Sequence, residues 1–299
     1  MPELPEVTTT VKGLNEVLPK LQINDVWSDY HVATANKRTD TIKNKKYFEY
    51  FKNEITGEKV KNAERRGKNV LIHLTGDKTI LIHMKMTGHL LYGKYSWNGK
   101  TWKSNEGLLS DPFNKFIHLI FTLSNGKYLA FSDMRKFAKV VLFETHKRDN
   151  MIDLVHLGPE PLDNLSFETF KKQLANKPKG KIKTVLMDQT VIAGIGNIYS
   201  DEILWEAGVH PEREVKSLKE KELLNMWKAT KIILKAGIKM GGDSMSDYRN
   251  IYGEKGGFQK VHKVYRRTKE MCLQKGCSGT ILRKVIGGRS SHFCDTHQK

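Results

Sequence analysis

The chain has 299 residues, which suits two or three domains of ordinary size, each able to bury its own core. Hydrophobic residues make up 38% of it and aromatic residues 9%, as in globular proteins. The 51 lysines and arginines against 33 acids give a formal net charge of +18, which favours a polyanionic partner. No run approaches the roughly 18 apolar residues of a membrane span, and the acidic N-terminus lacks a secretory signal pattern. We therefore expect a soluble, intracellular protein without membrane contact.

The N-terminal half combines one amphipathic helix with many short strands. Pro5 and Glu6 can open a helix, because the apolar residues after them recur every three to four positions. Short β-rich runs follow, at residues 70–74, 79–83, 117–123 and 128–132. Asn125-Gly126 is a strong hairpin signal between the last two. Many strands without alternating helices predict an antiparallel sandwich or barrel. Residues 92–112, rich in Gly, Asn, Ser and Trp, are expected to form an inserted loop or irregular hairpin.

After residue 150 the pattern becomes helical. Helices are predicted at residues 167–175 behind a Ser166 cap, 182–189, 198–207, and 218–236 behind a Ser217/Glu220 capping box. Before the third, glycines permit a tight turn and Asn197 can cap the helix, which predicts a helix-turn-helix with a phosphate-sized gap. Five glycines between residues 240 and 258 predict a mobile loop instead of a further helix. We expect three domains, at residues 1–150, 151–250 and 251–299.

All three cysteines lie close to the C-terminus, which argues against an extracellular disulfide framework. Cys272 and Cys277 form one pair, and Cys294 and His297 form a second pair after enough chain for a β-hairpin. This spacing is that of a tetrahedral structural Zn²⁺ site. His292 is a poorer substitute for the fourth ligand, because it lies two residues before Cys294. Residues 250–299 carry 11 Lys or Arg against three acids, so such a finger would present a basic hairpin to phosphates.

The N-terminus offers a nucleophile. Removal of the initiator methionine, usual before a small residue, would make Pro2 a free secondary amine. An α-amino group has a pKa of about 7.7–8.0 against about 10.4 for lysine, so far more of it is neutral at pH 7. Attack on the sugar C1′ of a nucleotide could displace the base and leave an iminium ion. Glu3 and Glu6 lie beside this amine for proton transfer.

Five sets of motifs, in order along the chain, resemble the formamidopyrimidine-DNA glycosylase and endonuclease VIII family. They are PELPEV at 2–7, RRGK at 65–68, HMKMTG at 83–88 with DMRKF at 133–137, GIGNIY at 194–199, and the GR pair at 288–289 before the second ligand pair. With LGPEPL at 157–162 marking the domain junction, the resemblance spans nearly the whole chain. It implies an α+β fold, in which an N-terminal antiparallel β-sandwich with flanking helices precedes a helix-two-turn-helix domain and a β-hairpin zinc finger.

The resemblance also assigns chemical roles. Pro2 matches the family's Schiff-base nucleophile, and Glu3 matches the glutamate that acts as acid and base at the sugar. Lys68 matches the lysine that assists β-elimination. Arg289 matches the finger arginine that clamps phosphate and supports δ-elimination.

Other matched residues are expected to bind DNA. Met86, Arg135 and Phe137 match the side chains that enter the base stack when the damaged base leaves. An enzyme that acts on a base takes it out of the helix, and apolar or planar groups must fill the hole. Asn197 matches the asparagine that binds the phosphate beside the lesion. Further DNA contacts are expected from Glu6, His118 and Lys179.

The chain departs from the family's usual pattern at three places. Thr8-Thr9 stands where bacterial members typically have Glu-Thr, four residues separate the first cysteine pair instead of two, and His297 replaces a cysteine. The metal is still expected, because imidazole is an equally good zinc ligand.

The hypothesis is a monomeric enzyme with no cofactor beyond structural zinc, acting on damaged double-stranded or single-stranded DNA. It would flip an oxidised base out, release it through Pro2, and cut the strand by β- and δ-elimination. Leu4 and the complete Met86, Arg135 and Phe137 set resemble the branch of the family that removes oxidised purines, while oxidised pyrimidines stay open. Two other classes compete: a DNA-binding protein without catalysis, which retained Met1 would favour, and an isomerase with a proline base. The isomerase explains neither the zinc finger nor the charge.

Overall fold

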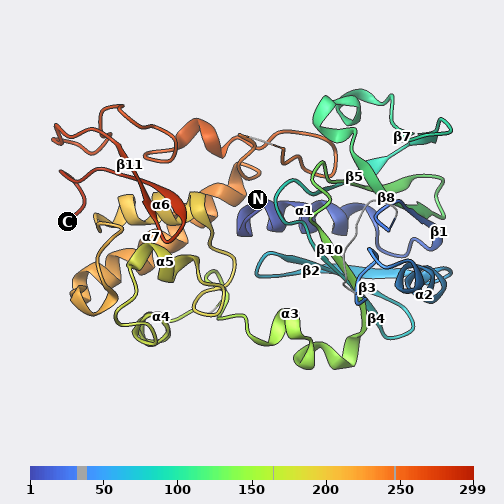
Figure 1. Ribbon diagram of the computed structural model, residues 1–299, viewed down its shortest axis with the longest axis horizontal. Coiled ribbons are helices and arrows are strands. Elements are labelled where there is room, and N and C mark those ends of the chain that lie inside the picture. The colour runs from blue at the N-terminus through green and yellow to red at the C-terminus, as the bar shows by residue number, and fades with distance from the viewer. Residues whose placement is uncertain (32–38, 164, 246) are drawn as a thin grey trace. The chain divides into compact units, whose positions relative to one another are not determined.

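The structure is a computed structural model that describes residues 1–31, 39–163, 165–245 and 247–299. The chain forms two compact units, which are Met1–Val155 with Gly241–Gly257, and His156–Met240 with Phe258–Lys299 (Figure 1). This division differs from the three domains expected from the sequence, because the chain returns to the first unit at residues 241–257. Residues 258–299 pack with the helical unit. Among the described helices, none combines the length and apolar character needed to cross a membrane.

The first unit is built on two four-stranded antiparallel sheets, as the sequence predicted. One sheet has the order β1 (Ile23–Ser28), β8 (Ile117–Leu123), β9 (Tyr128–Ser132) and β5 (His89–Gly93). The other has the order β10 (Lys139–Glu144), β4 (Lys78–His83), β3 (Asn69–Leu74) and β2 (Val60–Arg66). Alternate residues of both sheets, such as Phe121 and Ile72, meet in the main core. Two of the four predicted strands have the expected bounds, two begin one residue earlier, and Asn125-Gly126 does join β8 to β9.

Two helices pack against this sandwich. Helix α1 (Leu4–Val17) begins one residue before the predicted start, because the Glu6 side chain reaches back to the Glu3 N–H. Helix α2 (Lys45–Ile55) was not predicted. Its N-cap Asn44 accepts a hydrogen bond from the Tyr47 N–H, and its buried face contributes aromatic side chains to the main core. A short helix, α3 (Ile152–Val155), ends the first stretch of this unit.

The insert at residues 92–112 covers the outer face of the sheet that contains β5. It forms a small hairpin, β6 (Ser96–Trp97) and β7 (Trp102–Lys103), followed by two 3₁₀ turns. Leu91, Ile120 and Ala130 point outward from their strands and pack with Tyr95 and Leu109 of the insert. A sheet that is apolar on both faces needs a cover on each, so the insert forms a second, smaller core.

The described residues of the second unit form four α-helices and a hairpin. Their bounds are α4 (Phe167–Ala175), α5 (Ile182–Met187), α6 (Asn197–Ala207), α7 (Glu220–Lys239), β11 (Leu282–Ile286) and β12 (Arg289–Phe293). Helix α4 has the predicted bounds, and its Ser166 cap accepts from the Thr169 N–H. Helix α5 ends two residues before the predicted end.

Two predicted caps are wrong. Gly196 is the N-cap of α6, so Asn197 is the first helical residue instead of the cap. Helix α7 starts two residues later than predicted, because the Lys219 N–H donates to Glu222 Oε2 at 2.7 Å. Ser217 lies outside the helix, where its hydroxyl donates to the Glu214 carbonyl oxygen. A pattern of polar residues fixes a cap only to within a turn, since several side chains near a helix start can bind its free N–H groups.

Candidate functional site

The two residues just before helix α1 are buried. Pro2 is buried, Glu3 is 2% exposed, and Met1 is 39% exposed. Glu6 Oε2 accepts from the Glu3 N–H at 2.7 Å, which holds the chain ahead of the helix in a fixed path. The predicted nucleophile and its neighbouring acid are therefore placed by the start of a helix that is anchored in the core.

The glycine-rich segment 241–257 packs against this helix start. The Asp243 N–H donates to Glu6 Oε1 at 2.7 Å, and the Tyr248 hydroxyl donates to the Glu6 carbonyl oxygen at 2.9 Å. Gly242 has a φ of +85°, and a Cβ there would lie 2.8 Å from the Glu6 side chain. The close approach requires glycine. The described part of this segment contains no helix, as predicted, and it buries Tyr248 and Ile251.

Glu6 thus has a positioning role in the structure. Both of its carboxylate oxygens accept backbone N–H groups, and the side chain is 2% exposed. Sequence reasoning missed Asp243 and Tyr248, because nothing in local spacing connects residue 6 with a segment more than 230 residues away.

Lys68 lies in the turn between β2 and β3, at the same end of the sandwich as the start of α1. Asn15 exchanges two hydrogen bonds with the Ala63 backbone, and the Lys20 N–H donates to the Val60 carbonyl oxygen, so α1 and β2 run antiparallel. From the Asn15 contact with Ala63, the start of α1 lies about 16 Å away along the helix, at 1.5 Å per residue. In the same direction, β2 extends about 10 Å from Ala63 to its end at Arg66, at 3.3 Å per residue, and the turn with Lys68 follows. The start of α1 and the turn that carries Lys68 therefore lie toward the same end of the sandwich.

The Lys68 side chain is 6% exposed and lies near the end of β4. Burial and the positive charges of Lys85 and Lys68 lower the pKa of His83 to about 3. His83 is therefore neutral at pH 7, and its Nδ1 accepts a hydrogen bond from the Lys85 N–H at 3.0 Å.

The three predicted stack-filling side chains lie on two adjacent loops. Met86 is in the β4–β5 loop, and Arg135 and Phe137 are in the β9–β10 loop; each loop crosses from one sheet to the other. Phe137 is 49% exposed, and the Arg135 guanidinium lies 4.5 Å from the centre of its ring. An exposed aromatic ring under a guanidinium is a surface feature, so these two side chains are not part of the core.

Asp133 joins these two loops. It is fully buried, and its carboxylate accepts from the Thr87 hydroxyl at 2.6 Å, the Tyr30 hydroxyl at 2.9 Å and the Ala138 N–H at 2.9 Å. The Thr87 oxygen in turn accepts from the Arg135 N–H at 3.2 Å. Burial, together with the charge of Asp133, raises the pKa of Tyr30 well above its ordinary value, so this phenol stays a donor.

We expect Asp133→Ala to lower the free energy of unfolding by about 3 kcal/mol, because it leaves several buried donors without an acceptor. Urea denaturation followed by circular dichroism would measure this change. The exposed Asp149→Ala is the matched control and should change stability by less than about 0.5 kcal/mol. Equal stabilities of the two variants would show that the network does not hold the loops.

His118 is placed by an acidic partner. Its Nδ1 lies 2.8 Å from Asp29 Oδ1, and the Lys136 ammonium lies 3.1 Å from the other oxygen of that carboxylate. Burial acts to raise the pKa of Asp29, but its bonds to His118 and Lys136 hold it below the ordinary value. Asp29 therefore fixes the orientation of His118 beside the β9–β10 loop.

In the second unit, Asn197 begins α6 next to a buried ion pair. Lys183 is 0% exposed, and its ammonium donates to the Asn197 carbonyl oxygen at 2.9 Å and to Asp201 Oδ1 at 2.6 Å. Asp201 also accepts from the Ser291 hydroxyl and the His292 N–H of β12, at 2.7 and 2.9 Å. One buried pair thus ties α5, the start of α6 and the hairpin together. Sequence reasoning missed it, since a lysine in a helical pattern is normally exposed.

Two predicted phosphate contacts are exposed. Lys179 lies between α4 and α5, and Arg289 is the first residue of β12. Gly287 and Gly288, with φ of +56° and +75°, form the two-residue turn before Arg289. Within the described part of the chain, the Arg289 guanidinium has no hydrogen-bonding or ionic partner, so it is available to a ligand.

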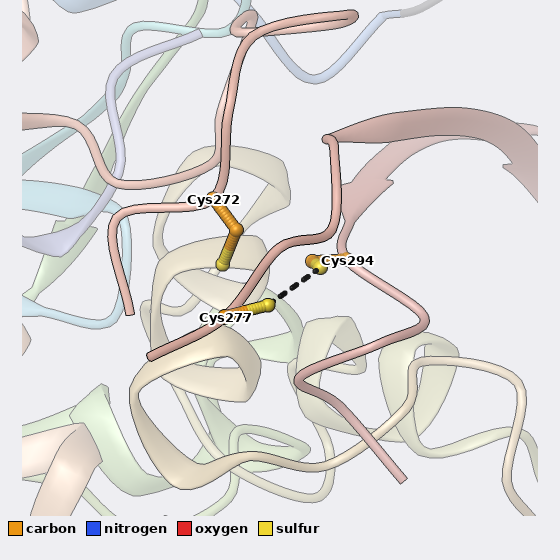
Figure 2. A group of neighbouring side chains, drawn as sticks. All are labelled: Cys272, Cys277 and Cys294. Atoms are coloured by element: carbon orange, nitrogen blue, oxygen red, sulfur yellow. Dashed lines mark hydrogen bonds between the residues drawn. The ribbon is translucent and has the colours of Figure 1, made fainter. Parts of the chain in front are cut away.

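The three cysteines form a metal-ligating group. Figure 2 shows their side chains converging, and all three Sγ atoms lie within 4.8 Å of one another. Cys277 Sγ and Cys294 Sγ are 3.7 Å apart, which is close to the roughly 3.8 Å between two sulfurs bound tetrahedrally to zinc at 2.3 Å. The donor set and its spacing therefore fit Zn²⁺.

The structure does not place His297 in this group. Its Nε2 lies 2.8 Å from the Trp205 carbonyl oxygen, and its ring packs 5.2 Å from the Trp205 ring. The substitute ligand His292 is likewise outside the group, because its Nδ1 lies 3.2 Å from Asp201 Oδ2. His297 as the fourth ligand therefore stays a prediction.

Comparisons with known proteins match the same family along the whole chain. Residues 1–140 match the model of the formamidopyrimidine-DNA glycosylase N-terminal domain, and residues 157–249 match that of the formamidopyrimidine-DNA glycosylase H2TH domain. Among curated relatives, the formamidopyrimidine-DNA glycosylase of Pelotomaculum thermopropionicum is 36% identical over 100% of this chain and 99% of its own. The protein of the same name from Bacillus cereus is 35% identical over 98% of each chain.

Solved structures give the same result. The Lactococcus lactis Fpg protein, in complex with DNA that contains an abasic site, is 30% identical with a TM-score of 0.83 over 99% of each chain. A variant of it, bound to DNA that contains Fapy-dG, is 29% identical with a TM-score of 0.82 over 100% of each chain. MutM in complex with DNA containing carbocyclic 8-oxo-G is 30% identical, also with a TM-score of 0.82 over the full length of both chains.

Proposed function

The chain belongs to the formamidopyrimidine-DNA glycosylase family and is thus a DNA glycosylase that acts on damaged DNA, and we propose that it works through a Schiff base at Pro2. The observation that carries this proposal is the placement of Pro2 and Glu3 at the anchored start of α1, on the sandwich end that also bears Lys68. The two competing classes, a non-catalytic DNA-binding protein and an isomerase, do not agree with this membership.

The proposed reaction begins after Met1 has been removed. The Pro2 nitrogen uses its lone pair to form a bond to C1′ of the damaged nucleotide, and the glycosidic bond breaks. Glu3 is the acid and base at the sugar, where it moves the proton that opens the ring. The product is an iminium ion that joins Pro2 to the deoxyribose, and the free base leaves.

Strand cleavage follows from the iminium ion. Loss of a C2′ proton sends electrons toward the cationic nitrogen and expels the 3′ phosphate, which is β-elimination. A second elimination expels the 5′ phosphate, and hydrolysis then frees the amine. We assign assistance of the first elimination to Lys68 and of the second to Arg289, whose guanidinium can pair with a leaving phosphate.

DNA is held by contacts in both units. The exposed Arg135 and Phe137, with Met86 beside them, are suited to fill the space left by an extruded base. Backbone N–H groups at the start of α6 favour an anion, which supports a phosphate site there, and we expect the Asn197 Nδ2–H to donate to that phosphate. Lys179 and Arg289 add cations, and His118, oriented by Asp29, adds a donor.

We propose Zn²⁺ as a structural ion held by Cys272, Cys277 and Cys294, which would stabilise the finger that carries Arg289. His297 is the candidate fourth ligand. Zinc-bound histidines usually make a hydrogen bond through the ring nitrogen that does not bind the metal. The contact of His297 Nε2 with a carbonyl oxygen is of this kind, and it leaves Nδ1 as the ligand atom.

Parallel cleavage assays test this function. Duplex and single-stranded oligonucleotides with 8-oxoguanine, formamidopyrimidine or thymine glycol at one position would be compared with an undamaged strand. We expect cleavage at purine lesions in duplex DNA, because the complete set of Met86, Arg135 and Phe137 resembles the purine-specific branch of the family. Both phosphates should be removed if Lys68 and Arg289 assist the two eliminations. Cleavage only at thymine glycol would contradict the purine assignment, and no cleavage of any lesion would contradict the function.

A further inference from the structure

The end of the insert, with Phe113 just after it, holds a buried arginine of the glycine-rich segment 241–257. Arg249 is 1% exposed. Its Nη2 lies 3.5 Å from Asp111 Oδ2, and its guanidinium carbon lies 4.9 Å from the centre of the Phe113 ring. An arginine is rarely buried without such partners, because removing its charge from water is costly. These contacts tie the segment to the insert, to which the proposed reaction gives no role.

Further contacts extend this junction. Asn114 is buried, and its Nδ2–H donates to the Leu108 carbonyl oxygen at 2.9 Å. That oxygen faces Gly253, where a Cβ would lie only 2.7 Å away from it. The Tyr92 N–H donates to the Ile251 carbonyl oxygen at 2.7 Å, so the segment also bonds to β5, the last strand of its sheet. The sheet and the insert therefore hold the segment together.

The same segment reaches Glu6 at the start of α1. The Tyr248 carbonyl oxygen accepts from Arg249 Nη1 at 2.9 Å and from the Ser244 hydroxyl at 2.8 Å. The Tyr248 hydroxyl donates to the Glu6 carbonyl oxygen, and the Glu6 carboxylate accepts from the Glu3 N–H. A short series of hydrogen-bonded residues thus joins Arg249 to the start of the helix.

We propose that Arg249 is a positioning residue for base release, a role that rests on the proposed function at Pro2. The base of a nucleotide is one bond away from the C1′ that Pro2 attacks, so we expect an extruded base to contact the segment beside Glu6. Arg249, held by the insert, keeps that segment in place. Different elements place the sugar, because Pro2 and Glu3 lie at the start of α1 and Lys68 lies in the β2–β3 turn. Loss of the arginine should therefore misplace the base more than the sugar, and a displacement of about 1 Å can cost about a hundredfold in rate.

Single-turnover rates of the full-length protein on two duplexes test the proposal. One duplex carries the lesion that the unchanged protein releases fastest, and the other carries a preformed abasic site, which has a sugar but no base. We expect Arg249→Met to slow base release by about 10- to 100-fold and to change abasic-site cleavage by less than about threefold. Arg249→Lys, which keeps the charge, should restore base release to within about threefold of the unchanged rate.

Asp111→Asn is a milder second variant. Its amide oxygen can still accept from the Phe113 N–H, as the carboxylate does at 2.8 Å, but the charge beside Arg249 is lost. Asp111 is partly exposed, so the fold should accept the change. Base release should slow by about 3- to 10-fold, with abasic-site cleavage unchanged. Arg148→Met is the matched control, because it breaks the two hydrogen bonds of Arg148 to Glu64 in the same unit, and it should leave both rates unchanged.

Two results would overturn this inference alone. Equal slowing on both duplexes in Arg249→Met would show a purely structural role, and unchanged base release in both Arg249→Met and Asp111→Asn would show that the insert does not position the segment. If Arg249→Met does not fold, Asp111→Asn decides by the same two results. Absence of abasic-site cleavage by the unchanged protein would instead contradict the proposed function at Pro2, and this inference with it.

Discussion

A preparation that begins with Pro2 will cleave lesion-containing DNA, whereas the same chain with one extra residue ahead of Pro2 will be slower by about a thousandfold or more. The reason is that acylation turns the secondary amine into an amide, whose nitrogen has no nucleophilic lone pair. Every other residue of the proposed site stays in place. Cleavage rates of an 8-oxoguanine duplex by the two preparations, with both N-termini checked by mass spectrometry, measure the effect.

The fold should accept the extra residue. Met1 is 39% exposed while Pro2 is buried, so an extension at the N-terminus points to solvent and leaves the helix start intact. The two preparations should therefore unfold at the same temperature. Equal cleavage rates in both would show that the amine of Pro2 is not the nucleophile.

We expect removal of the proposed zinc to unfold the finger. Binding of a structural zinc contributes about 10–16 kcal/mol to such modules, so without the metal the hairpin that carries Arg289 loses its main support. We expect about one zinc per chain by atomic absorption, and its removal by a chelator should weaken DNA binding by tenfold or more, because phosphate contacts are lost.

Two variants sharpen this prediction. Cys277→Ser should abolish stoichiometric zinc. If His297 is the fourth ligand, His297→Ala should lower the zinc affinity by more than the roughly 10- to 100-fold that is typical for a residue that only orients a ligand. The exposed His146→Ala, in the first unit, is the matched control and should leave the zinc content unchanged. Full zinc content in Cys277→Ser would contradict the metal site.

Local patterns predicted much of the fold. Strands β8 and β9 and their Asn125-Gly126 turn follow from alternation and turn chemistry within a few residues, and α4 follows from its Ser166 cap. The cysteine group also follows from spacing alone, since ligands on a short finger must be close in sequence. These features depend on neighbours along the chain, which a sequence displays directly.

The rest depends on contacts between distant segments. Glu6 binds the backbone of Asp243, and Lys183 pairs with Asp201, which in turn holds β12; no local pattern displays these partners. The insert was predicted only as an irregular hairpin, because its apolar side chains become a core only against the outer face of a sheet. Helix α2 was missed, since its buried aromatic residues resemble a strand-forming run when the packing is unknown.

Borohydride reduction in the presence of lesion-containing DNA, followed by peptide mass mapping of the trapped protein, tests the central claim most directly. Reduction turns the iminium ion into a stable amine, so the account predicts a covalent protein–DNA adduct whose DNA fragment lies on the N-terminal peptide at Pro2, and none above background with the preparation that has one extra residue ahead of Pro2. An adduct on Lys68 or another lysine, no adduct, or equal trapping by the extended preparation would contradict it.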